Sequence, residues 1–170
     1  MEAENAAVEG EAVEGVDIEA LRRKVDLIAD RLGKPIDVGV KEAVVALWAI
    51  GFETDGSCEG HSDHGVDYPV VYASAPVPEN VDEDDLCEQF KWREANMHLR
   101  AKLEALLDEY YEGDDSSIKL GIEDRGKLGP ITFRPLPSEK IVKADLDRYQ
   151  RDIERFSAFV VQKYDKSRSK

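Results

Sequence analysis

Apolar residues recur at three- and four-residue steps in four stretches of the chain, and this spacing predicts four helices. The first helix is expected over 17–32, where Gly33 stops the pattern. The second is expected over 38–50, with Asp37 as its N-terminal cap and Gly51 at its end. The first fifty residues therefore predict two consecutive helices.

Two longer helical patterns lie further along the chain. The third helix is expected to begin at a cap on Asp82 and to run to Tyr111. The fourth is expected to begin at Ser138 and to keep a near-heptad spacing of apolar residues through Val160. Such a spacing is typical of a helix packed on its own domain, and also of a coiled coil between chains.

Short runs of β-branched and aromatic residues between the helices predict strands. One strand is expected over 68–74, and two more, over 118–124 and 130–136, flank a glycine-containing turn as a hairpin. The segment 51–57 is a candidate for an additional strand. This order predicts an α+β fold, in which a small mixed or antiparallel sheet of three to four strands packs with four helices.

Composition refines this outline. Residues 1–15 are acidic and small, without a buried face, so we expect a disordered acidic tail before a single α+β domain over 16–170. With 170 residues, 42% of them hydrophobic, the chain is long enough to bury one core. Its two cysteines do not form a disulfide framework, and the N-terminus lacks a basic, apolar leader, so a reduced, cytoplasmic protein is expected.

The net charge of −14 changes the expected partners. A field of this sign disfavours generic binding to nucleic acid and to anionic membranes. No apolar stretch approaches the ~20 residues needed to span a bilayer. The expected partner is a small molecule or another protein. One alternative is therefore an acidic protein-interaction module that uses its long helices and has no catalytic activity.

The segment FETDGSCEGHSDHGVDYP, at 52–69, gathers two of the three histidines and one of the two cysteines. Connections between core elements are common places for functional residues. The alternative is structural, with the cysteine buried at a strand end and the histidines bonded to a turn. We expect a site at 54–64, and its candidate residues are Thr54, Ser57, Cys58, Glu59, Gly60, His61 and His64.

A metal site is the first interpretation of this segment. Cys58, His61 and His64 stand in a C-x2-H-x2-H spacing, and thiolate and imidazole are the ligands that zinc prefers. The candidates for a fourth ligand are Asp63, Cys87, His98 and water.

Two other chemistries fit the same residues. In a catalytic thiol site, Cys58 is the nucleophile, His61 the base, and Glu59 the group that orients the imidazole. In a small-ligand site, the hydroxyls of Thr54 and Ser57 and the main-chain N–H groups around Gly60 bind a carboxylate, a phosphate or a modified nucleotide. The sequence leaves these three alternatives open.

The longer segment ALWAIGFETDGSCEGHSDHGVDYPVVY, at 46–72, resembles a pattern in uncharacterised small bacterial and phage proteins, with Ser-Cys-x-Gly-His between a helix and a strand. Within it, TDGSCEGH is similar to the Thr-x-Ser-Cys-Ser-Gly-Arg segment of the wybutosine-synthesis tRNA methyltransferase family. The resemblance matches Ser57, Cys58 and Gly60, and His61 stands where that family has arginine. It implies S-adenosylmethionine as a cofactor.

Overall fold

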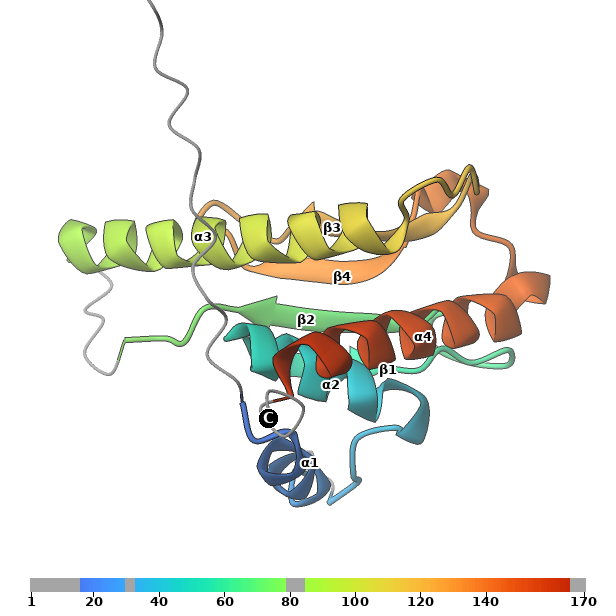
Figure 1. The fold of residues 1–170 in the computed structure, drawn as a ribbon, viewed down its shortest axis with the longest axis horizontal. Helices are drawn as coiled ribbons and strands as arrows, with labels where there is room; N and C mark the ends of the chain where they lie inside the picture. Colours follow the sequence, from blue (N-terminus) through green and yellow to red (C-terminus); the bar gives the residue numbers. More distant parts are fainter. Residues whose placement is uncertain (1–15, 30–32, 79–84, 166–170) are drawn as a thin grey trace, which may run out of the picture.

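The computed structural model of the chain describes residues 16–29, 33–78 and 85–165 (Figure 1). Within these ranges lie four α-helices, α1 (Ile18–Asp26), α2 (Val38–Ile50), α3 (Leu86–Tyr110) and α4 (Leu146–Tyr164). The strands are β1 (Glu53–Cys58), β2 (Val70–Ser74), β3 (Lys119–Asp124) and β4 (Ile131–Leu136). The predicted α+β class is confirmed, and the candidate strand at 51–57 corresponds to β1.

The four strands form one antiparallel sheet in the order β1-β2-β4-β3. The predicted hairpin is β3–β4, in which Gly121 pairs with Arg134. β1 lies at one edge of the sheet and carries an irregularity in register between Thr54 and Gly56. The C-terminal end of this edge strand is where the candidate segment begins.

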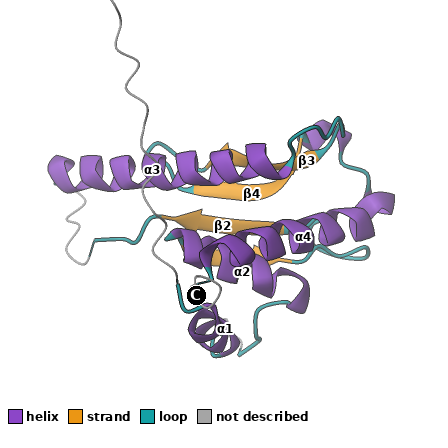
Figure 2. Cartoon of the chain, in the orientation of Figure 1, coloured by secondary structure: helices purple, strands orange, loops and turns teal. Residues whose placement is uncertain are grey.

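The helices and the sheet share one hydrophobic core. Along β4, Ile131, Phe133 and Pro135 are buried while the residues between them are half-buried, as expected for a sheet covered on one face. α3 packs against β3, α2 packs against β1 and β2, and α4 packs against α2. Figure 2 shows α3 apart from the pair formed by α2 and α4. α1 packs against α2. The core cluster takes buried residues from all four helices and from β2, β3 and β4.

The first helix is shorter than predicted. α1 ends at Asp26, whereas the helical spacing continues to residue 32. The chain instead turns back after Leu27, and Ala29 forms an isolated antiparallel bridge with Pro35. A main-chain pairing of this kind overrides the helical preference of the local sequence. Residues 30–32 lie outside the described part of the chain.

The last helix begins later than predicted. Ser138 starts a short 3₁₀ turn, and α4 begins only at Leu146. Between them Val142 is extended, and its main-chain N–H donates to the Tyr149 hydroxyl at 3.0 Å. The near-heptad stripe of α4 is buried from Tyr149 through Val160, and Leu146 at its start is half-buried.

The start of α3 also differs from expectation. The cap of α3 is Asp85, whose carboxylate accepts the main-chain N–H groups of Cys87 and Glu88. The expected cap at Asp82 lies outside the described residues, as does the predicted tail at 1–15. None of the described helices combines the length and the apolar character that a membrane crossing requires.

Two adjacent tyrosines connect α3 to α4. The hydroxyls of Tyr110 and Tyr111 donate to the Asp152 carboxylate at 3.2 and 2.5 Å, and the Leu120 N–H donates to the Tyr111 oxygen at 2.8 Å. Burial, reinforced by the charge of Asp152, raises the pKa of Tyr110 to about 12. Burial and the hydrogen bond to Asp152 raise the pKa of Tyr111 further. The neutral phenols therefore stabilise the folded state.

We expect the protein to lose stability at alkaline pH because of these tyrosines. An unfolded tyrosine ionises near pH ~10, so above that pH the unfolded chain releases protons that the folded chain retains. The free energy of unfolding should then fall as the pH rises from 10 towards 12. Tyr111→Phe should lower stability at pH 7 by about 1–3 kcal/mol, because it removes hydrogen bonds, and should make the alkaline loss shallower. Urea unfolding of the wild type and of Tyr111→Phe at pH 7, 10 and 12 measures these free energies. If both proteins lost the same stability between pH 10 and pH 12, the prediction would be wrong.

Candidate functional site

Two reciprocal hydrogen bonds join the N-terminus of α2 to the end of β1. The main-chain N–H of Glu59 donates to Asp37 Oδ2 at 3.3 Å, and the N–H of Gly39 donates to Glu59 Oε2 at 2.8 Å. The first N–H groups of a helix have no partner within the helix and attract carboxylates. Glu59 therefore caps α2 from a different part of the chain. Gly39 permits the approach, since a Cβ there would lie 2.8 Å from Glu59 Oε2.

Asp37 stands at the cap position of α2, but its side chain makes no capping hydrogen bond, contrary to the prediction. Because Glu59 accepts the Gly39 N–H, the Asp37 carboxylate is free to turn towards β1. Its Oδ2 lies 3.8 Å from His61 Nε2. The carboxylate beside the imidazole is thus Asp37, and the predicted orienting residue Glu59 is engaged with α2.

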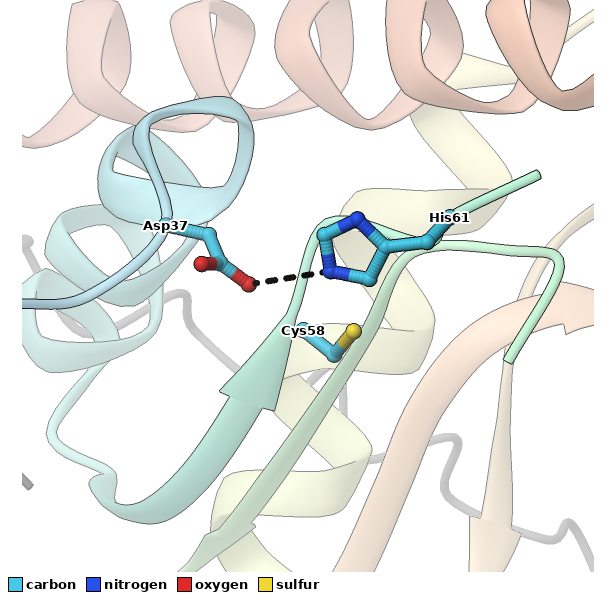
Figure 3. Close-up of side chains that lie close together, drawn as sticks. All are labelled: Asp37, Cys58 and His61. Carbon is cyan, nitrogen blue, oxygen red and sulfur yellow. Dashed lines mark ion pairs between the residues drawn. The ribbon is translucent and has the colours of Figure 1, made fainter. Parts of the chain in front are cut away.

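Asp37, Cys58 and His61 point towards one another at this end of β1 (Figure 3). Each side chain is half-buried, and one donor atom from each lies within 4.8 Å of the other two. We call this group the Asp–Cys–His cluster. A carboxylate oxygen, a thiolate and an imidazole are all ligands of zinc. In a tetrahedral zinc site such donors lie about 3.5 Å apart, so a contraction of about 1 Å would bring all three within reach of one ion.

The main chain around the cluster is held by hydrogen bonds. Cys58 Sγ accepts the N–H of Gly60 at 3.4 Å. From α4, Gln150 Nε2 donates to the carbonyl oxygens of Glu59 and Gly60, at 2.9 and 3.4 Å. Groups that orient a metal ligand in this way tune its affinity for the ion. The cluster is therefore supported by α2 on one side and by α4 on the other.

His64 does not lie in the Asp–Cys–His cluster. Its ring stacks on that of His61, with 4.2 Å between the ring centroids and 13° between the planes. Its Nδ1 lies 2.7 Å from Asp63 Oδ1, and this hydrogen bond lowers the pKa of Asp63. The C-x2-H-x2-H spacing brings the two imidazoles together, but the third donor of the cluster comes from Asp37.

The predicted ligand-binding residues are divided between two places. Thr54 and Ser57 line a cavity of about 360 Å³ between β1 and the connection that precedes α2. We call it the β1 cavity, and Asp37 belongs to its wall as well as to the cluster. Thr54 Oγ1 also accepts the indole N–H of Trp48 at 3.1 Å. Gly60 is buried beneath α4 instead.

Asp37 is the residue that sequence reasoning missed. It precedes Glu59 by 22 positions, and an aspartate before an apolar helix predicts an ordinary cap. The available signal was Gly39, because glycine in the first turn of a helix weakens the helix unless another group approaches its main chain. That group is Glu59.

No family model, curated protein or solved structure matches the chain. Two resemblances stay predictions, that of residues 46–72 to small bacterial and phage proteins and that of TDGSCEGH to the methyltransferase segment. A functional interpretation therefore depends on the geometry and chemistry of the site itself.

Gly60 gives a test of how the loop is held. Its φ is +82°, and a Cβ there would lie 2.7 Å from the carbonyl carbon of Tyr68 and 2.7 Å from Leu146 Cδ1. Gly60→Ala should therefore destabilise the fold by about 2–5 kcal/mol, from left-handed strain and overpacking combined.

Gly65→Ala is the matched control for Gly60→Ala. Gly65 has a φ of +67°, but the nearest atom to an added Cβ is His61 Cδ2, at 3.9 Å. Only the backbone strain remains, so the loss should be about 1 kcal/mol. Urea unfolding of the two variants gives both values. Equal losses would show that Gly60 is not confined by its neighbours.

Proposed function

We propose that the protein binds a divalent transition metal ion of the zinc class through Asp37, Cys58 and His61. The observation that carries this proposal is the convergence of three chemically different donors within 4.8 Å of one another. Two of them are neighbours at the end of β1, and the third comes from the start of α2. A thiolate and a carboxylate together neutralise the charge of a divalent cation, and the neutral imidazole adds none.

The surroundings favour a cation over an anion at the cluster. The whole chain carries a net charge of −14, and Asp63 and Glu59 lie close to the donors in sequence. The Gly60 N–H that points at Cys58 Sγ supports a thiolate ligand, because such a donor stabilises negative charge on sulfur. A free phosphate or carboxylate would meet repulsion from the same carboxylates.

The geometry favours a metal site over the catalytic thiol site. A catalytic relay needs one imidazole nitrogen on the thiol and the other on the carboxylate. Here Nε2 faces Asp37, and Figure 3 shows Nδ1 at the edge of the ring turned away from the Cys58 sulfur. The three donors surround a common point, which suits an ion.

A zinc ion with three protein ligands keeps a fourth position for water or a small ligand, and in that position it can activate water or polarise a carbonyl group. The β1 cavity shares Asp37 with the cluster and is a suitable place for such a ligand. Its volume of about 360 Å³ lies at the lower end of the range for small-molecule pockets. Binding of a modified nucleotide or S-adenosylmethionine there stays a prediction of the sequence.

Elemental analysis of protein purified without a histidine tag tests the metal. We expect about one equivalent of zinc in the wild type, and its loss in Cys58→Ser and in His61→Ala, because each removes one of three ligands. Cys87→Ser and His98→Ala are matched controls, since Cys87 and His98 are exposed on α3. These two should keep the metal. Less than about a tenth of an equivalent in the wild type would exclude the proposal.

A second candidate function is supported by an exposed apolar stripe on α3. Leu86, Phe90 and Met97 are 77%, 67% and 59% exposed, and their spacing places them on one face of the helix. Figure 1 shows the N-terminal turns of α3 extending past the sheet. Large exposed apolar side chains that share one helix face are typical of protein-interaction surfaces. This stripe is the observation that favours the interaction-module alternative.

The two candidate functions respond to different substitutions. If the α3 stripe binds a partner, Phe90→Glu should weaken the complex by at least about tenfold, because it places a charge in an apolar contact. The same variant should keep its zinc, since Phe90 lies outside the cluster. Cross-linking in cells followed by elemental analysis of the same sample measures both properties. A complex that survives Phe90→Glu and Met97→Glu would contradict the interaction role.

A further inference from the structure

A second histidine, His64, lies beside the cluster and is a candidate for the fourth ligand of the metal. The His64 ring lies parallel to the His61 ring, with 4.2 Å between their centroids. A metal bound to His61 Nε2 would lie about 2.0 Å beyond that nitrogen. A second imidazole is thus already stacked on the ligand that would hold the ion.

The ion pair between His64 and Asp63 is weak. Its side chain is 68% exposed, and that of its ion-pair partner Asp63 is 81% exposed. An exposed pair of this kind contributes little to stability, because water competes for both groups and screens their charges. A neutral imidazole that leaves the carboxylate for a zinc ion gains a much stronger bond.

The main chain near His64 allows this movement without unfolding the loop. The N–H of His61 donates to the Val66 carbonyl at 2.8 Å, which closes the loop at its base. His64 stands inside that closed loop, next to Gly65, which has a φ of +67°. A change of its side-chain torsions therefore moves the ring while the closing hydrogen bond stays in place.

We propose that His64 is an exchangeable fourth ligand of the metal. Its imidazole moves off the Asp63 carboxylate and fills the coordination position that the Asp–Cys–His cluster leaves open. This inference rests on the proposed metal site. It predicts two states of the bound ion. In the closed state four side chains surround it, and in the open state His64 is back on Asp63 and a water or small ligand replaces it. His64 then controls access to the metal from solvent.

Nuclear magnetic resonance of the imidazole nitrogens tests the proposal directly. The full-length protein is titrated with Zn²⁺ alone, and its three histidines give three resolvable rings. We expect one ring nitrogen of His61 and one of His64 to shift on zinc binding, while His98 stays unchanged. His64→Ala should still bind one equivalent, but at least about tenfold more weakly.

Rescue by free imidazole distinguishes a metal ligand from a structural residue, because imidazole can replace a missing ligand but cannot restore lost packing. With Co²⁺ as the probe, millimolar imidazole should restore the wild-type absorption spectrum to His64→Ala, because it occupies the vacated position. His98→Ala is the control and should behave as the wild type.

The failures of the two proposals are distinguishable. If the wild type binds zinc, the His64 resonances do not move and His64→Ala keeps the wild-type affinity, the exchange of His64 is excluded and the three-ligand site stands. If the wild type binds neither Zn²⁺ nor Co²⁺, both the metal site and the role of His64 are excluded.

Discussion

The reciprocal hydrogen bonds between Asp37, Gly39 and Glu59 are the constraint on which the candidate site depends. They connect the first turn of α2 to the residue that follows β1, two places that are distant in sequence. The unpaired N–H groups of a helix N-terminus demand an acceptor, and Glu59 supplies it. Because that demand is met from outside, the natural cap residue Asp37 is released for another role. A local question of helix capping thus determines which side chains meet at the end of β1.

This arrangement differs from a metal site built from one contiguous loop. The cluster uses one residue before α2, one at the end of β1 and one in the loop after it. The start of α2 is fixed by a helix that packs into the hydrophobic core, and Cys58 is fixed by the pairing of β1 with β2. The loop is held by α4 through Gln150. Small zinc domains need the ion in order to fold, because their ligands have no other support. Here the donors are assembled by the fold, so folding and the proposed metal binding are separable.

The sequence predicts the elements of this protein better than their ends. The α+β class follows from spacing alone, because periods of two and of three to four residues separate strands from helices. The early end of α1 and the late start of α4 depend instead on particular local hydrogen bonds, namely the bridge from Ala29 to Pro35 and the bond from Val142 to Tyr149. Neither contact appears in the spacing of apolar residues, which is the signal that predicts a helix.

The same distinction applies to the site. Cys58 and His61 are recognisable because reactive side chains gather in one short segment. Asp37 is not recognisable, because its role depends on a hydrogen bond to Glu59 that the fold creates. His64 was expected among the metal ligands on spacing alone, but in the structure its ring stacks on that of His61 and lies outside the cluster. Spacing along a chain indicates which residues can approach one another, and tertiary structure decides which atoms converge.

The cluster has a rigid side and an adaptable side, and this asymmetry is the physical basis for ligand exchange. Asp37 is held by the Glu59 N–H, and Cys58 ends a strand and accepts the Gly60 N–H, so neither can move far. His61 and His64 stand in a loop that is closed only at its base, with exposed side chains at its tip. The contraction needed to coordinate an ion must therefore come mainly from the histidines. A metal bound as we propose would keep a carboxylate and a thiolate ligand in place while the imidazoles adjust, and would therefore stay bound as its fourth ligand changes.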